Sequence, residues 1–426
     1  MSASPSPARG SYVRVTWPGW CALAAVVLLP WAVVWRNRSA SPSVVRPSAA
    51  SPAALGQPGQ APSSSVVGRG RQGPWGRLEF SRILIEPTED FIRPSTLDPR
   101  PLKWVFSGYT DAALEALWQR AGLTDRERQV LGAPANRERV GDAIVIRPPA
   151  DLVLGLSASA RAAIYIALAA FPENIPQYDS YRINANAADQ WLDSDLIAPN
   201  VIAMIRPLLY PRGPNLMFSD VDLILPRLGS VQERVRLAKN LSRRSALLVQ
   251  VRVEHKDDAE ALARYWGRGG RSKDVEPLLQ SLIQRPEGGS IDIVHLLPVF
   301  ARALLYTYPT PSEDPRAAAR DCHWTSLNFF NQTPDDRFLN LEQVLKSLQS
   351  DYYPYGGEPA LGDIALLVTA EGQGIHSCVY VADGIVFTKN GPASSVPWLL
   401  APLADVEAFY TTGGPMTIRY YRRKSF

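Results

Sequence analysis

The chain has 426 residues, of which 46% are hydrophobic and 11 are Trp, so it has enough apolar side chains for more than one buried core. Its 45 basic and 41 acidic residues leave a net charge of +4, which is too close to balance to indicate a nucleic-acid partner. Three Cys and four His do not supply the paired ligand sets of a structural zinc site, so we expect no metal and no cofactor.

The first patterned segment is an apolar run that follows a tail of residues 1–16. Residues 17–35 are uncharged, rich in Ala, Val and Leu, and bounded by Arg14 and Arg36. This length is close to the roughly 20 apolar residues that cross a bilayer, and Trp near both ends is typical of membrane interfaces. We expect one transmembrane helix here and not a cleaved signal peptide, because arginines stand where small residues would mark a cleavage site.

Residues 36–75 are dominated by Ser, Pro, Ala and Gly, which predicts a disordered linker. Residues 76–312 then have the mixed periodicities of an α/β domain, to which no role is assigned. Residues 268–272 lack the spacing and lysine of a phosphate-binding loop, so we expect a flexible surface turn there. The predicted helices are residues 111–121, 158–171, 231–241 and 257–266, and the predicted strands are residues 143–146 and 246–254.

A candidate nucleophile opens a helical pattern in the last segment, residues 313–426. Cys322 follows Asp321, which suits a helix cap, and Pro334 suits a stop. A helix start and a nearby imidazolium both lower the pKa of a thiol, which makes it a better nucleophile. Successive helical residues are turned by about 100°, so we expect His323 to point away from the thiol. The alternative is that Cys322 is a small core residue.

A β-hairpin is predicted downstream, with its turn at Asp383-Gly384. Alternation places His376 and Cys378 on one face of the first strand. Thr388 and Asn390 share a face of the second strand, and either side chain has the polarity to orient an imidazole. Cys378 is expected to be a filler residue, although its position leaves a disulfide with Cys322 or an exchanged nucleophile open.

These motifs resemble the NlpC-type papain-like cysteine peptidases of bacterial cell-wall remodelling, over roughly residues 315 to 426 in the C-terminal third of the chain. The matching features are Asp321-Cys322 at a helix start, Pro359-x-x-Gly362-Asp363 before a strand, and His376 opening a strand that contains Tyr380. The pattern departs from the family at His323-Trp324, where a Ser-Gly pair is usual, at Cys378, and at the third polar position, which falls near Thr388.

The resemblance implies an α+β fold in which the helix that carries the cysteine packs on an antiparallel sheet. It also implies Cys322 as nucleophile, His376 as general base and a third polar residue that orients the imidazole. We assign Asn390 to that third position on chemical grounds, with Thr388 as the alternative, because an amide oxygen can accept from an imidazole N–H.

The resulting hypothesis is a cysteine hydrolase that cleaves peptide or amide bonds, with a peptidoglycan stem peptide as substrate. It would be a single-pass protein of a bacterial inner membrane with its body outside the cytoplasm, an orientation that follows from the resemblance because the flanking positive charges are nearly balanced. A transglutaminase-like acyl transferase and a catalytically inactive papain-like binding module are the alternatives.

Overall fold

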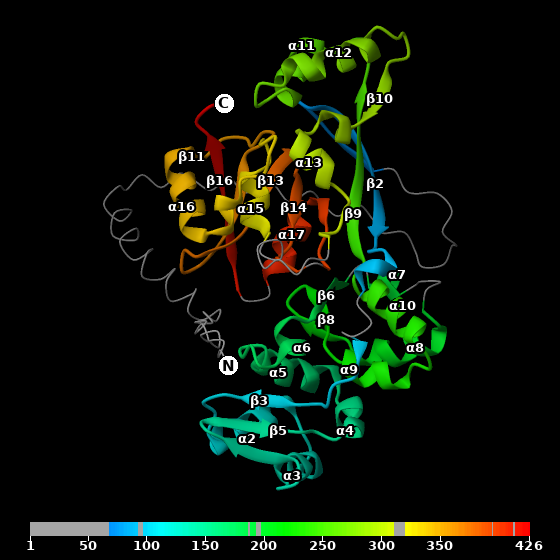
Figure 1. The fold of residues 1–426 in the computed structure, drawn as a ribbon, viewed down its shortest axis with the longest axis vertical. Helices are drawn as coiled ribbons and strands as arrows, with labels where there is room; N and C mark the ends of the chain where they lie inside the picture. Colours follow the sequence, from blue (N-terminus) through cyan, green and yellow to red (C-terminus); the bar gives the residue numbers. More distant parts are fainter. Residues whose placement is uncertain are drawn as a thin grey trace, which may run out of the picture. The chain divides into compact units, whose positions relative to one another are not determined.

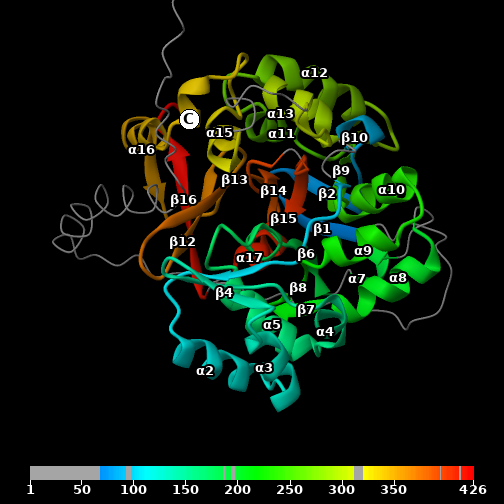
Figure 2. The same ribbon diagram turned by 60° about the horizontal axis from the view of Figure 1, so that its bottom comes forward.

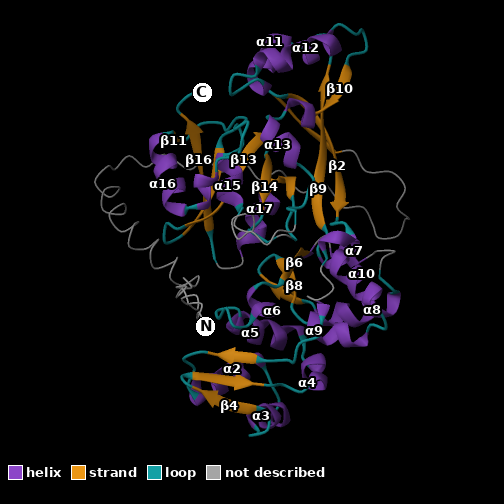
Figure 3. Cartoon of the chain, viewed as in Figure 1, coloured by secondary structure: helices purple, strands orange, loops and turns teal. Residues whose placement is uncertain are grey.

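A computed structural model describes residues 68–92, 97–185, 188–192, 197–310, 320–393, 395–411 and 414–426. This part of the chain is of the α+β class, with helices and antiparallel sheets, as expected (Figures 1 and 3). The expected membrane helix at residues 17–35 lies outside the described residues. None of the helices within them has the length and apolar character needed to cross a bilayer.

A four-stranded antiparallel sheet combines the first described residues with a later segment. Its strand order is β1-β2-β9-β10. The strands are β1 (Gly68–Gly73), β2 (Gly76–Ile85), β9 (Arg244–Val253) and β10 (Gly289–Asp292), and the neighbouring helices are α11 (Ala259–Trp266), α12 (Ser272–Ile283) and α13 (Val299–Leu304). Residues 68–75 were assigned to the linker, and that boundary is wrong. Residues 68–73 form β1, which pairs with β2 through backbone hydrogen bonds, and Trp75 is buried. Backbone pairing does not require an alternating apolar pattern, so no pattern in the sequence indicated this strand.

The middle of the chain carries two three-stranded antiparallel sheets, ordered β3-β5-β4 and β6-β8-β7. The helices expected at residues 111–121 and 231–241 and the strand at residues 143–146 are confirmed. The strands are β3 (Trp104–Phe106), β4 (Arg137–Val140), β5 (Ala143–Ile146), β6 (Tyr181–Asn184), β7 (Tyr210–Arg212) and β8 (Asn215–Phe218). The helices are α2 (Asp111–Ala121), α3 (Asp125–Gly132), α4 (Ala150–Gly155), α5 (Ala158–Leu168), α6 (Ile175–Tyr178), α7 (Ala188–Leu192), α8 (Pro199–Ile205), α9 (Val221–Ile224) and α10 (Val231–Leu241).

The C-terminal segment forms a six-stranded antiparallel sheet of order β11-β16-β12-β13-β14-β15. Its strands are β11 (Tyr352–Tyr355), β12 (Ile364–Thr369), β13 (Gly374–Ala382), β14 (Ile385–Lys389), β15 (Trp398–Pro402) and β16 (Met416–Arg423). Its helices are α15 (Cys322–Leu327), α16 (Leu341–Ser350) and α17 (Leu403–Tyr410). Figure 2 shows α15 and α17 beside the strands of this sheet. Trp324 of α15 belongs to the same buried cluster as Val379, whereas Val406 of α17 belongs to the cluster that contains Cys378, so the two helices cover opposite faces of β13.

The expected boundary between residues 312 and 313 does not divide the hydrophobic core. One cluster of buried side chains joins Leu78 and Val251 of the four-stranded sheet to Trp324 and Phe387 of the C-terminal segment. Tyr265 Oη also donates to Val381 O at 2.7 Å. The C-terminal segment therefore depends on the strands and helices around it for part of its apolar burial.

The Gly362-Asp363 turn that leads into β12 is fixed by buried charge. The Asp363 side chain is fully buried and accepts two hydrogen bonds from Arg422, at 2.9 and 2.6 Å. Arg268 lies 3.5 Å from the same carboxylate and donates to Leu361 O. Gly269 and Gly270 do form an exposed turn with positive φ, but the expectation that residues 268–272 are only a surface turn is wrong, because Arg268 anchors that turn to Asp363.

We predict that Asp363→Asn strongly destabilises the protein, because it leaves two partly buried guanidinium groups, those of Arg268 and Arg422, without their buried counter-charge. The expected loss is about 3–5 kcal/mol in the free energy of unfolding. Urea unfolding of the full-length protein followed by Trp fluorescence measures it. Asp405→Asn, which breaks a surface ion pair with Arg82, is the matched control and should cost below about 1 kcal/mol. Equal losses in the two variants would contradict a structural role for the buried carboxylate.

Candidate active site

Cys322 is the first residue of α15, where the sequence predicted it. Asp321 caps the helix: its Oδ1 accepts from the backbone N–H groups of His323 and Trp324 at 2.9 Å each. The cap therefore uses two of the amides that an unoccupied helix end would offer to a thiolate. Since α15 has only six residues, its dipole contributes little, and the thiol needs positive charge from elsewhere.

His376 lies on β13, fully buried, and it is positioned from two sides. Its Nε2 is 3.0 Å from Thr388 Oγ1 on β14, and its ring stacks on Tyr410 of α17, with 4.3 Å between ring centroids and 21° between planes. Its Nδ1 has no well-aligned hydrogen-bond partner among the described residues. This leaves Nδ1 as the nitrogen available to the thiol.

Thr388 contacts the imidazole directly, and Asn390 lies one hydrogen bond further away. Thr388 Oγ1 donates to Asn390 Oδ1 at 2.9 Å. Because the hydroxyl proton is committed to that amide, Thr388 accepts the proton on His376 Nε2. The sequence therefore predicted the segment that contacts His376. It favoured Asn390 for the direct contact, whereas the structure has Thr388, the alternative, in that position.

His323 does not point away from the thiol, and that expectation is wrong. Its Nδ1 is 2.9 Å from Ser377 Oγ on β13, and the same hydroxyl lies 3.3 Å from Cys322 O. Side chains of a helix lean towards its N-terminus, so the first two helical residues both reach beyond the helix end despite their 100° separation. This geometry brings a second imidazole beside the thiol.

The two imidazoles decide the ionisation of the thiol. Burial by itself would raise the pKa of Cys322, but the charges of His323 and His376, with a smaller contribution from hydrogen bonding, lower that pKa to about 5. Burial likewise works to lower the pKa of His323, and the adjacent thiolate outweighs it and raises this pKa to about 9. The geometry therefore favours a thiolate paired with imidazolium at neutral pH.

Cys378 has a different environment, although it is on the same strand as His376. Both Cys322 and Cys378 are free thiols, so no disulfide joins them. The Cys378 Sγ donates to Ala365 O at 3.7 Å inside an apolar cluster, and burial raises its pKa. These surroundings are those of the filler residue that the sequence suggested.

The thiol is almost inaccessible to solvent: Cys322 is 6% exposed and His376 is not exposed at all.

The β6-β8-β7 sheet contributes to the surroundings of the site through α17. Asn215 Nδ2 donates to Ala408 O at 2.8 Å, and the Arg182 guanidinium donates to Phe409 O and lies 4.2 Å from the Phe409 ring centroid. These bonds hold the end of α17 that carries Tyr410, the residue stacked on His376.

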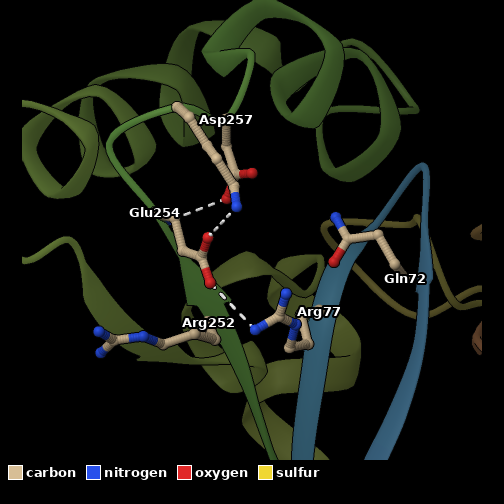
Figure 4. A pocket seen from close by; sticks show the side chains of 6 residues that line it. Gln72, Arg77, Arg252, Glu254 and Asp257 are labelled. Carbon is tan, nitrogen blue, oxygen red and sulfur yellow. Dashed lines mark hydrogen bonds and ion pairs between the residues drawn. The ribbon is translucent and has the colours of Figure 1, made fainter.

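A surface depression of about 220 Å³ lies elsewhere, beside β1, β2 and the end of β9 (Figure 4). Its charged groups pair with one another: Arg77 and Lys256 both contact Glu254, at 3.0 and 2.9 Å. It contains no nucleophile, so it does not compete with the thiol as a reaction centre. Within the described ranges, no three His, Cys, Asp or Glu side chains gather as they would around a metal ion.

Comparison with known proteins gives no assignment. The chain matches no protein-family model, no curated protein and no solved structure. Inference about function therefore depends on the thiol site itself.

We predict that Cys322 is the reactive thiol and that its reactivity is almost independent of pH near neutrality. Its alkylation rate with iodoacetamide should change less than about threefold from pH 6.5 to 8.5, whereas a thiol of ordinary pKa would gain on the order of fiftyfold. The rate should fall below pH about 5, where the thiolate is protonated. Mass spectrometry of limiting-reagent digests assigns the label, and preferential labelling of Cys378 would contradict the assignment.

Proposed function

We propose that this protein is a membrane-anchored cysteine hydrolase with an NlpC-type papain-like C-terminal domain, which cleaves an amide bond in peptidoglycan stem peptides. Cys322 attacks the carbonyl carbon and forms a thioester, and His376, oriented by Thr388 and Asn390, serves as general base. The observation that carries the proposal is that two imidazoles, His323 and His376, adjoin the Cys322 thiol at the start of α15, where their charges lower its pKa to about 5, as an activated nucleophile requires.

The arrangement around His376 supports a hydrolytic reading. One imidazole nitrogen is available to the thiol and the other bonds Thr388, which is the nucleophile, base and orienting-group order of thiol hydrolases. The order of motifs along the chain, Asp-Cys, Gly-Asp, then His on a strand, supports the NlpC-type assignment. An apolar N-terminal run followed by a long polar segment suits a polymer that lies off a membrane surface, outside the cytoplasm.

The segment before residue 313 is proposed to limit access to the thiol. Two of its side chains, Arg182 and Asn215, hold the carbonyl end of α17, and Tyr410 on that helix covers His376. A substrate that reached the thiol would have to pass these groups or displace them.

We predict that full-length protein in detergent releases new fragments from purified muropeptides and that Cys322→Ala abolishes this release. A full-length chain is needed because the hydrophobic core extends across residue 313. Liquid chromatography with mass spectrometry identifies the cleaved bond. Cys378→Ala is the matched control: it removes the other buried thiol, which donates to Ala365 O and has no role in the proposed reaction, and it should retain activity.

An absence of fragments while Cys322 still alkylates readily would refute the peptidoglycan substrate. Acyl transfer would then be tested by adding a primary amine with a glutamine-containing peptide, because a thioester attacked by an amine uses the same nucleophile. An inert Cys322 in folded protein would instead indicate a binding module.

We predict a graded effect at the orienting residues. Thr388→Val removes the hydroxyl at nearly constant shape, and it should lower kcat about tenfold, the value of one hydrogen bond. Asn390→Ala should lower kcat less, since its amide contacts the imidazole only through Thr388. A larger loss for Asn390→Ala than for Thr388→Val would show that the amide contacts the imidazole directly during turnover.

A further inference from the structure

The proposed mechanism uses one histidine, yet two imidazoles lie beside the thiol. His376 sits behind it: fully buried, stacked on Tyr410, with Nε2 bound to Thr388. His323 sits on the helix end and is only partly buried. Of the two, His323 is therefore the imidazole with access to the outside of the site.

The position of His323 is specified by β13. Ser377 Oγ lies 2.9 Å from His323 Nδ1, 3.1 Å from Ser326 Oγ and 3.3 Å from Cys322 O. A hydroxyl has one proton to give and two lone pairs, so Ser377 can accept from His323 Nδ1–H while it donates to an oxygen of α15. This arrangement makes Nδ1 a protonated nitrogen that is committed to Ser377. The ring also hydrogen-bonds the Cys322 side chain, and Nε2 is the nitrogen left for that contact.

We propose that His323 is a second catalytic imidazole, which pairs with the Cys322 thiolate in the resting enzyme and donates its Nε2 proton to the leaving nitrogen of the substrate. The proposal rests on the proposed function in taking Cys322 as the nucleophile and an amide as the substrate class. His376 then keeps the thiolate in place from the buried side, as a positioning residue in this half of the reaction.

The proton balance closes without a further reactant. The thiolate sulfur forms a bond to the carbonyl carbon, the C–N bond breaks, and the Nε2 proton of His323 passes to the departing amine, which leaves a thioester and a neutral imidazole. In the second half, water adds to the thioester and gives a proton to a neutral site imidazole, and the C–S bond breaks. A carboxylic acid leaves, and the thiolate–imidazolium pair is restored.

The other charged and titratable groups around the thiol do not replace His323. Asp321 on the cap and Tyr410 on α17 supply no cation, and Cys378 on β13 is a buried neutral thiol. Lys389 on β14 is fully buried, and its ammonium donates to Gly391 O and Ala393 O, so it is already committed to the loop that follows β14. The raised pKa of His323, caused by the adjacent thiolate, is consistent with a proton held at this ring.

The test compares the pH dependence of Cys322 alkylation in full-length wild type, His323→Gln and Ser377→Ala. His323→Gln should lower the iodoacetamide rate at pH 6 at least tenfold and leave the rate at pH 9 within about threefold, because the thiol loses its counter-charge and its pKa rises. Ser377→Ala should shift the profile in the same direction by less. His295→Gln, at an exposed histidine elsewhere, is the matched control and should leave the profile unchanged. An unchanged profile in folded His323→Gln would overturn the proposal.

A measurement on the wild type covers the case in which His323→Gln does not fold. One histidine ring signal in the proton NMR spectrum should titrate at unusually high pH, move to lower pH by more than one unit after Cys322 is alkylated, and broaden with a soluble paramagnetic agent. The broadening distinguishes partly buried His323 from fully buried His376. If the signal that responds to alkylation is protected from the agent, His376 carries the counter-charge and the proposal fails.

These readouts do not depend on the substrate. If muropeptides are not cleaved but the alkylation profile shifts as expected, the thiolate–His323 pair stands and only the proposed substrate is wrong. If muropeptides are cleaved, His323→Gln should lose the alkaline limb of the kcat/KM profile and at least a hundredfold in kcat, since the general acid is missing. Retained kcat in that variant would overturn the proton-donor role.

Discussion

An ionised thiol that is nearly removed from water is stable only if positive charge lies next to it, and the arrangement of the C-terminal segment follows from that requirement. The two free cysteines illustrate this requirement, since both are buried, Cys322 at the start of α15 and Cys378 on β13. Burial raises the pKa of Cys378, which has a carbonyl oxygen for its polar neighbour. The pKa of Cys322 is lowered, because the charges of two imidazoles together outweigh the effect of its burial. Neighbouring charge, more than depth of burial, therefore separates the pKa values of the two thiols.

Supplying that charge requires α15 and β13 to be fixed against each other. Ser377 ties β13 to the first turn of α15, and Trp398 Nε1 donates to Thr325 Oγ1 at 3.0 Å, which ties β15 to the same helix. The β13–β14 hairpin is also held at its turn, where Arg71 of β1 donates to the Asp383 carboxylate through its backbone N–H and its guanidinium. Segments from both ends of the described chain thus restrain the strands that carry His376 and Thr388.

Local signals in the sequence were enough to place the main parts of the site. The Asp-Gly turn fixed the hairpin, with Asp383 and Gly384 both at positive φ, and Asp321 marked the helix start through a capping geometry that depends only on adjacent residues. Contacts between residues far apart in the chain could not be predicted from such local signals. The pairing of Asp363 with Arg268 joins residues 95 positions apart, and the choice of Thr388 over Asn390 depends on how far β13 and β14 are offset. The expectation that His323 points away from the thiol fails because the 100° angle between helical residues does not describe the lean of side chains towards the helix N-terminus.

The same non-local contacts change how the segment before residue 313 should be understood. A separate domain would contribute its own core and a polar interface, whereas here one hydrophobic cluster contains residues from both sides of that position. Arg182 and Asn215 of the β6-β8-β7 sheet donate to the carbonyls of Phe409 and Ala408 near the end of α17. The next residue, Tyr410, stacks on buried His376. Because the Tyr410 stack and the Thr388 bond together position His376, displacement of α17 would remove one of the two contacts that hold the imidazole. The orientation of His376 therefore depends, through α17, on side chains from the segment before residue 313.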